Sequence, residues 1–172
     1  MSYKNFPMVS RVIFGRGSFN QLDEIITPKR QGREAPFIYY VDNVFKGNHW
    51  LTSRVTLSYK DKIIYIPTTE EPKTEQIDQL VEDLILEFSE RPSAIIGIGG
   101  GIVLDIAKAV SLMLTNEGEA KDYQGWDLIK TNSMTAKQGD TPLSAPADFI
   151  VLNASAGSGK TYSLVQHILM NA

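Results

Sequence analysis

The stretch SAIIGIGGGIVLDIAKAV, residues 93–110, decides the fold class of this chain. Its first seven residues are almost continuously apolar, which is typical of a parallel strand that is covered on both faces. Three consecutive glycines end the run, and after them apolar residues recur at helical spacing: Ile102, Ile106, Ala107 and Val110. A buried strand, a glycine loop and an amphipathic helix in this order indicate an α/β unit.

Further apolar runs on either side of this stretch predict more strands, at 11–15, 36–42, 62–67 and 148–153. Between the strands at 62–67 and 93–99, a helix is predicted with Pro72 in its first turn. Its apolar residues recur at helical spacing on one face: Ile77, Leu80, Val81, Leu84, Ile85 and Phe88. We therefore expect an α/β fold with a Rossmann-like parallel sheet and flanking helices.

Composition excludes several classes of protein. The 172 residues carry a formal net charge of -3 and no cysteine, which argues against a broad nucleic-acid-binding surface, a disulfide framework and a zinc ribbon. The sequence contains no apolar run near the roughly 18 residues that cross a bilayer. We expect a soluble, cytoplasmic protein with a small-molecule partner and no membrane or nucleic-acid partner; its oligomeric state stays open.

The glycine loop itself has two interpretations. Glycines between a strand and a helix let backbone N–H groups approach a phosphate, so the loop could hold the pyrophosphate of a dinucleotide. The alternative is a tight turn whose glycines serve only close packing. The standard G-x-G-x-x-G pattern begun at Gly97 fails, because Ile102 occupies the position of the last glycine.

Three motifs carry a family resemblance: VDNVF (41–45), EEPKTEQIDQLVE (70–82) and GIGGGIVLDIAKAVSLML (97–114). Over residues 12–130 the chain resembles the N-terminal half of iron-containing (group III) alcohol dehydrogenases. Within that family GRGSF (15–19), EPKT (71–74) and DYQGWDLIK (122–130) look closest to the branch that oxidises the eight-carbon sugar acid Kdo at its terminal carbon.

The resemblance implies a site for NAD or NADP. Asp42 matches the acid that meets the adenosine ribose, which favours NAD. Gly99, Gly100 and Gly101 match the pyrophosphate glycines, although Ile102 stands where the family usually has Ser or Thr. Asp105 and Lys108 match an acid and a base of the motif, and a helix-surface pair is the alternative role for them.

The resemblance also implies elements that this chain is expected to lack. In the family a helical domain supplies an Asp and three His that hold the catalytic metal, Fe or Zn. The chain has two histidines, His49 and His167, in unrelated settings, so it is expected to be truncated before that domain and unable to bind the metal. The family's next strand and a threonine-rich turn are also expected to be missing after Lys130.

A second loop, NASAGSGKT (153–161), follows the strand at 148–153. It resembles the Walker A motif of UvrD/RecB-type helicases, as does the whole of 134–172, and would hold ATP and Mg²⁺ through six residues: Ala156, Gly157, Ser158, Gly159, Lys160 and Thr161. Only 4 of the 37 charged residues lie beyond residue 133. This shift predicts a cofactor domain at 1–130, a linker at 131–147 and a strand, P-loop and helix fragment at 148–172.

The preferred hypothesis is an NAD(P)-dependent oxidoreductase that takes hydride from an alcohol, with a sugar-acid hydroxyl as one candidate. It would be present as a cofactor-binding half without catalytic residues and inactive alone. The alternatives are an ATP-binding helicase fragment and a non-catalytic chimera. In a further structural hypothesis, the strand at 148–153 docks on the open edge of the dehydrogenase sheet.

Overall fold

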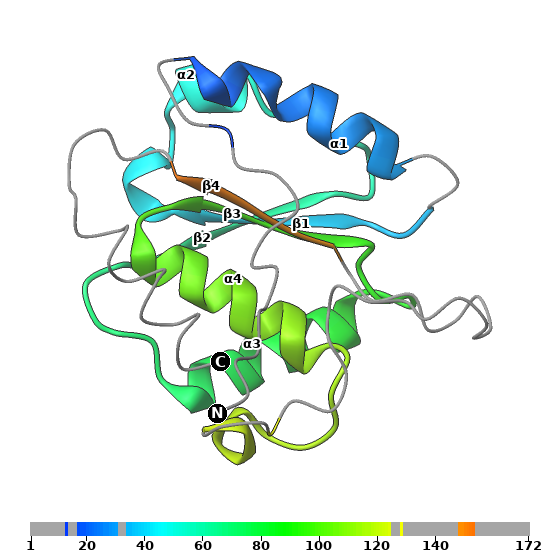
Figure 1. The fold of residues 1–172 in the computed structure, drawn as a ribbon, viewed down its shortest axis with the longest axis vertical. Helices are drawn as coiled ribbons and strands as arrows, with labels where there is room; N and C mark the ends of the chain where they lie inside the picture. The colour runs from blue at the N-terminus through cyan, green and yellow to red at the C-terminus, as the bar shows by residue number, and fades with distance from the viewer. Residues whose placement is uncertain (1–12, 14–16, 31–33, 125–127, 129–147, 154–172) are drawn as a thin grey trace, which may run out of the picture.

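The protein is described by a computed structural model, which covers residues 13, 17–30, 34–124, 128 and 148–153. Four strands form one sheet in the order β2-β1-β3-β4, and every neighbouring pair is parallel. The strands are β1 (Phe37–Asp42), β2 (Lys62–Ile66), β3 (Ala94–Gly99) and β4 (Asp148–Asn153). Figure 1 shows the sheet as a twisted layer between two layers of helices.

The two central strands owe their place to their sequence. β1 reads FIYYVD and β3 reads AIIGIG, and every residue of the two strands except Asp42 is buried. Such strands suit the middle of a parallel sheet, where both faces are covered. Side chains of one strand alternate between the faces, so each strand contributes to two separate cores.

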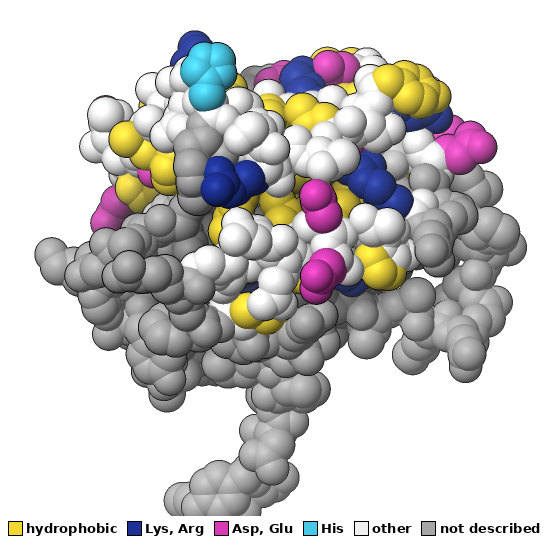
Figure 2. All heavy atoms as spheres, turned by 90° about the horizontal axis from the view of Figure 1, so that it is seen from above, with side chains coloured by type: hydrophobic (Ala, Val, Ile, Leu, Met, Phe, Trp, Pro, Cys, Tyr) yellow, Lys and Arg dark blue, Asp and Glu magenta, His cyan; other side chains and the backbone are white. Residues whose placement is uncertain are grey.

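One face of the sheet packs against the first helices of the chain. The 3-10 helix η1 (Ser18–Gln21) leads into α1 (Leu22–Arg30), and the short α2 (His49–Thr52) follows β1. The core of this face is built from residues of α1, of α2 and the connection after it, and of alternate positions of the strands: Leu22, Ile26, Phe37, Tyr39, Val41, Leu51, Val55, Ala94, Ile96 and Ile98. Figure 2 looks onto this face and shows basic and acidic side chains interspersed there.

The opposite face carries the two longer helices, α3 (Thr74–Glu87) and α4 (Gly101–Met113). α4 is the more apolar, with seven buried residues, and it packs on β3, on β1 and against α3. Its buried residues join the other positions of the strands, among them Ile38, Tyr40 and Ile95. Two short 3-10 helices, η2 (Asn43–Phe45) and η3 (Ala120–Tyr123), follow β1 and α4.

The α/β, Rossmann-like fold is confirmed. β1, β2 and β3 lie within a residue of their predicted bounds, and β4 has the predicted bounds. The expected strand at 11–15 lies outside the described residues except for residue 13. Pro72 was misplaced, because Lys73 is the N-cap of α3 and Pro72 therefore precedes the helix.

Residues 148–153 have a partner in the sheet. All six residues of β4 pair with β3, from Ala94 with Asp148 to Gly99 with Asn153. The docking hypothesis is therefore confirmed for this strand. Within the described residues, no helix is long and apolar enough to cross a membrane.

Candidate functional site

The site is set by the connections of the two central strands. β1 and β3 are neighbours, but the chain leaves β1 through η2 and α2 towards β2, whereas it leaves β3 into α4 on the opposite face. In an open parallel sheet, such a divergence opens a crevice beyond the carboxyl ends of the two strands, and ligands bind there. Asp42 is the last residue of β1, and Gly99 is the last residue of β3.

Gly99 brings these two strand ends into close approach. A Cβ atom at Gly99 would stand 2.9 Å from the Asp42 Cβ and 3.1 Å from a methyl group of Val103. Its φ of +158° is also one that residues with side chains rarely adopt. Earlier in β3, Gly97 allows α4 to pack closely, since its Cβ would stand 3.1 Å from Ala107. The close-packing interpretation therefore holds for Gly97 and for Gly99.

Gly100 is different, because it faces open space. Apart from its chain neighbours, no atom of the described residues would lie within 4 Å of a Cβ atom added there. Gly100 is the N-cap of α4, Gly101 is the first helical residue, and no side chain caps this end. The first N–H groups of a helix lack intrahelical partners, and the helix dipole makes this end positive. The open space in front of α4 therefore suits an anion such as a phosphate group.

Asp42 presents its carboxylate beside this loop in a defined orientation. The backbone N–H of Val44 donates a hydrogen bond to Oδ1 over 3.0 Å, and the hydroxyl of Thr68 donates to the same oxygen over 3.3 Å. Among the described residues no hydrogen bond reaches Oδ2. An ionised carboxylate has about four acceptor positions, so the half-buried Asp42 keeps capacity for a donor from a ligand.

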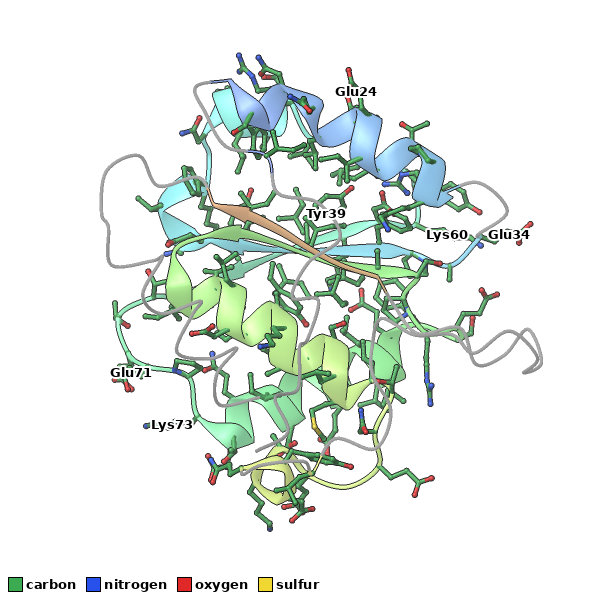
Figure 3. All side chains as sticks on the ribbon, viewed as in Figure 1. Glu24, Glu34, Tyr39, Lys60, Glu71 and Lys73 are labelled. Atoms are coloured by element: carbon green, nitrogen blue, oxygen red, sulfur yellow. The ribbon has the colours of Figure 1, made fainter. Side chains whose placement is uncertain are left out.

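An open hollow of about 310 Å³ lies beyond the carboxyl end of β2, next to Thr68 in the chain. Residues of the β2–α3 connection and the start of α3 line it, among them Pro67, Glu71 and Lys73. In Figure 3 Glu71 and Lys73 lie at this end of the sheet. At the carboxyl ends of the strands, the hollow therefore lies beyond β2, Asp42 ends the neighbouring β1, and the glycine loop follows β3.

Asp105 and Lys108 lie further along α4. Burial raises the pKa of Asp105 to about 6, although the charge of Lys108 opposes the shift. Burial also lowers the pKa of Lys108, against the influence of Asp105. The Lys108 ammonium group is buried and has no hydrogen-bond partner among the described residues. These two side chains are therefore not a solvated pair on the helix surface.

The two histidines and the predicted ATP-binding loop add nothing to the described site. His49 is exposed on α2, and no group of three potential metal-ligating side chains occurs within the described residues. His167 and the predicted ATP-binding residues, Ala156 to Thr161, lie outside the described part of the chain. Thr68 was missed by sequence analysis. Its position just after a predicted strand, at the edge where Asp42 also lies, was the available signal.

Solved structures of dehydrogenases share this fold. An archaeal halo-thermophilic alcohol dehydrogenase from a Red Sea brine pool matches with a TM-score of 0.59 and 16% identity, over 92% of this chain and 38% of its own. The iron-containing alcohol dehydrogenase of Thermococcus thioreducens gives 0.54 and 18%, over 87% and 36%. The sulfoacetaldehyde reductase of Bifidobacterium kashiwanohense, solved in complex with NAD+, gives 0.51 and 16%, over 66% and 29%.

The chain thus spans between 29% and 38% of the length of these three proteins. The family model described as iron-containing alcohol dehydrogenase matches residues 9–169. This match continues through the segment beyond residue 133 that the charge distribution had separated. It lends no support to a helicase-derived piece, a chimera or the Kdo branch. The chain belongs to the iron-containing alcohol dehydrogenase family.

Proposed function

We propose that this chain binds NAD(H) where β1 and β3 end, as the cofactor-binding part of an oxidoreductase that transfers hydride between an alcohol and a nicotinamide. The observation that carries the proposal is the meeting of Asp42 and Gly99 at the strand ends, where a Cβ on Gly99 would stand 2.9 Å from that of Asp42. An acid for the ribose and a glycine loop for the pyrophosphate are the two elements of a dinucleotide site at a switch point.

Each element has a separate role in the proposal. The pyrophosphate lies over Gly99, Gly100 and Gly101, where the space in front of Gly100 and the positive end of α4 receive it. The Asp42 carboxylate accepts a hydrogen bond from a ribose hydroxyl. A 2′-phosphate at that point would bring two negative groups together, so the site prefers NAD over NADP.

We give Asp105 and Lys108 a lesser part in binding. An α-helix rises about 1.5 Å per residue, which places Asp105 and Lys108 roughly 6 and 10 Å along α4 from Gly101. The Lys108 ammonium is also buried. These residues add positive and negative potential near the phosphate rather than a direct hydrogen bond to it.

The bound nicotinamide would supply the hydride chemistry, and the protein supplies binding and orientation. The described residues do not converge on a metal site, so no metal-dependent step is assigned to them. The substrate class is an alcohol or the matching carbonyl compound. The sugar-acid branch depends on the short motifs at 15–19, 71–74 and 122–130 alone.

Calorimetric titration of the full chain with NAD+, NADP+ and ATP–Mg²⁺ tests the proposal. We expect NAD+ to bind more tightly than NADP+, and Asp42→Ala to lose about tenfold in NAD+ affinity, as expected for a hydrogen bond to a charged group. A folded wild-type chain that gives no heat at millimolar NAD+ would rule the proposal out. If ATP–Mg²⁺ alone bound and Lys160→Ala abolished that binding, the ATP-binding alternative would replace it.

A further inference from the structure

We propose that Thr68 is a positioning residue for the cofactor site, because its hydroxyl holds the Asp42 carboxylate in the orientation that leaves Oδ2 available to the ribose. This inference rests on the proposed binding of NAD(H). Thr68 follows β2 by two residues, so the hydrogen bond joins the carboxyl ends of β2 and β1 across 26 positions of sequence.

The distribution of hydrogen bonds on Asp42 supports this role. The Val44 N–H and the Thr68 hydroxyl both donate to Oδ1, over 3.0 and 3.3 Å, and no donor among the described residues reaches Oδ2. The carboxylate torsion of an aspartate is broad and nearly two-fold, so one donor leaves the plane of the group free to turn. A second donor to the same oxygen, from the segment that follows β2, fixes the plane.

The neighbouring strand restricts Asp42 from its other side. A Cβ on Gly99 would stand 2.9 Å from the Asp42 Cβ, which shows how closely the backbone of β3 approaches the base of this side chain. β1, β2 and β3 thus all contribute to its placement. A group that is fixed before binding loses less conformational freedom when the ligand arrives, which raises affinity without any new contact.

A fixed carboxylate also sharpens the choice of cofactor. Ionised Asp42 only accepts hydrogen bonds, so it favours a ribose hydroxyl and disfavours a 2′-phosphate, which is charged. If the carboxylate could turn away, its hydrogen bond with the ribose hydroxyl would weaken, and so would its repulsion of a 2′-phosphate. Loss of the Thr68 hydroxyl should therefore weaken NAD+ binding more than NADP+ binding.

The test is a set of variants of the full chain titrated with NAD+ and with NADP+. Thr68→Val removes the hydroxyl and keeps the shape of the side chain, and Thr68→Ser restores the donor. Thr69→Val is the matched control, since Thr69 is the adjacent threonine and donates no hydrogen bond to Asp42. The same Thr68→Val change is also made in the Asp42→Ala background, as a double-mutant cycle.

We expect Thr68→Val to weaken NAD+ binding about three- to tenfold, as for one hydrogen bond, and to lower the ratio of NAD+ to NADP+ affinity. Thr68→Ser and Thr69→Val should both stay within about twofold of the wild type. In the Asp42→Ala background, Thr68→Val should have no further effect, because its action passes through the carboxylate.

The outcomes separate this inference from the proposed function. If the folded wild type binds no NAD+, both are overturned. If it binds NAD+ but Thr68→Val leaves affinity and cofactor ratio unchanged, the positioning role alone fails. The positioning role also fails if Thr68→Val lowers the affinities for NAD+ and NADP+ by the same factor. It fails too if Thr68→Val lowers NAD+ affinity as much in the Asp42→Ala background as in the wild type, because Thr68 would then only hold the loop in place.

Discussion

Two aspartates at opposite ends of the sheet show how differently the same side chain can be used. At the amino end, the side chain of Asp61 is 1% exposed. It accepts hydrogen bonds from Phe37 N at 2.9 Å, from Ser58 N at 2.8 Å and from the Arg30 guanidinium on both oxygens. At the carboxyl end, the half-buried Asp42 accepts two hydrogen bonds, both on Oδ1. A saturated carboxylate stabilises the fold, whereas one with spare acceptor capacity can bind a ligand.

The residues around the two aspartates differ in the same way. Arg30 also donates to the Tyr39 hydroxyl over 3.1 Å and stacks over the Phe37 ring at 4.2 Å. Burial raises the pKa of Tyr39 to about 12, although Arg30 opposes the shift, so the hydroxyl stays neutral at physiological pH. Figure 3 shows Tyr39 between α1 and the sheet. The carboxylate at the amino end is thus saturated by hydrogen bonds from its neighbours, whereas Gly100 at the carboxyl end has no other described atom near the position of a Cβ.

The largest effect is expected from breaking the amino end. Asp61→Ala leaves the Arg30 charge, with 26% of its side chain exposed, without its partner, and it leaves Phe37 N and Ser58 N without acceptors. Loss of one member of a buried ion pair costs about 3–5 kcal/mol, so we expect a fall of that size in the free energy of unfolding measured in urea. Asp61→Asn, which keeps one acceptor, should cost less.

NAD+ affinity provides the control for this variant. Under conditions where Asp61→Asn remains folded, its affinity for NAD+ should equal that of the wild type, because Asp61 lies at the other end of the strands. A loss of affinity in a fully folded variant would contradict the separation of the two ends. A stability change below about 1 kcal/mol for Asp61→Ala would show that the buried network contributes little.

The second prediction divides the carboxyl end into a packing glycine and a binding glycine. Gly99→Ala forces a methyl group against Asp42 and Val103, so it should lower the unfolding free energy by about 1–3 kcal/mol and weaken NAD+ binding together. The Cβ of Gly100→Ala meets no atom within 4 Å in the part of the chain that the structure describes, apart from its chain neighbours, so stability should stay within about 1 kcal/mol. Its methyl group occupies the proposed phosphate space, and NAD+ affinity should fall at least tenfold.

Chemical denaturation and titration of the same two preparations check this pair. If Gly100→Ala bound NAD+ as tightly as the wild type, the pyrophosphate could not lie in front of α4. If Gly99→Ala were as stable as the wild type, the strand ends would have room to separate, and the close approach of β3 to Asp42 would not be required by the fold.

Sequence reasoning reached the carboxyl end of the sheet but not the amino end. Asp42 ends one apolar run and Gly99 to Gly101 follow at the end of another, and the family resemblance implied that they hold the cofactor. Parallel strands place their carboxyl ends together. Asp61 and Arg30 are 31 positions apart, and neither lies in a recognisable motif. Their pairing depends on how α1 packs on the sheet and on side-chain torsions, which a local pattern does not contain.

β4 shows the same limit for a whole strand. The apolar run at 148–153 was enough to predict a strand, because its residue types favour extended backbone. Its partner was left between two alternatives. The low charge content beyond residue 133 and the helicase-like loop suggested a separate piece, and the open edge of the dehydrogenase sheet offered a place for the strand to dock. The register of β4, with Gly99 opposite Asn153, is set by a pairing between segments about fifty residues apart.

The third prediction concerns Lys108 and tests whether the cofactor is contacted by residues further along α4. Lys108→Met replaces a buried ammonium, which has no hydrogen-bond partner among the described residues, with an apolar group of similar length. Removing an unsatisfied buried donor should raise the unfolding free energy by about 1 kcal/mol at neutral pH. Since Lys108 is given no direct hydrogen bond to the cofactor, NAD+ affinity should change by less than about threefold. A tenfold loss would instead place Lys108 in direct contact with the cofactor.

The pH dependence of stability gives this variant a second readout. Burial lowers the pKa of folded Lys108 below its unfolded value, so the unfolded chain binds more protons between the two values. Wild-type stability should therefore rise as the pH increases through that window, and the advantage of Lys108→Met should shrink towards pH 10. Urea denaturation at a series of pH values measures this. A constant difference between the two proteins would mean that the Lys108 pKa is the same in the folded and unfolded states.

The smallest effect is expected from a second ion pair near the amino end, between Lys62 and Glu87. Both side chains are substantially exposed, 39% for Lys62 and 43% for Glu87, so water screens their attraction and holding them together costs side-chain entropy. Glu87→Gln should lower the unfolding free energy by less than about 0.5 kcal/mol, and high salt should remove the difference. A loss of unfolding free energy comparable with that of Asp61→Ala would show that charge pairing alone stabilises this end of the sheet. A much smaller loss for Glu87→Gln than for Asp61→Ala would instead show that the stability of this end depends on the burial of Asp61 and on the hydrogen bonds that its carboxylate accepts from backbone N–H groups.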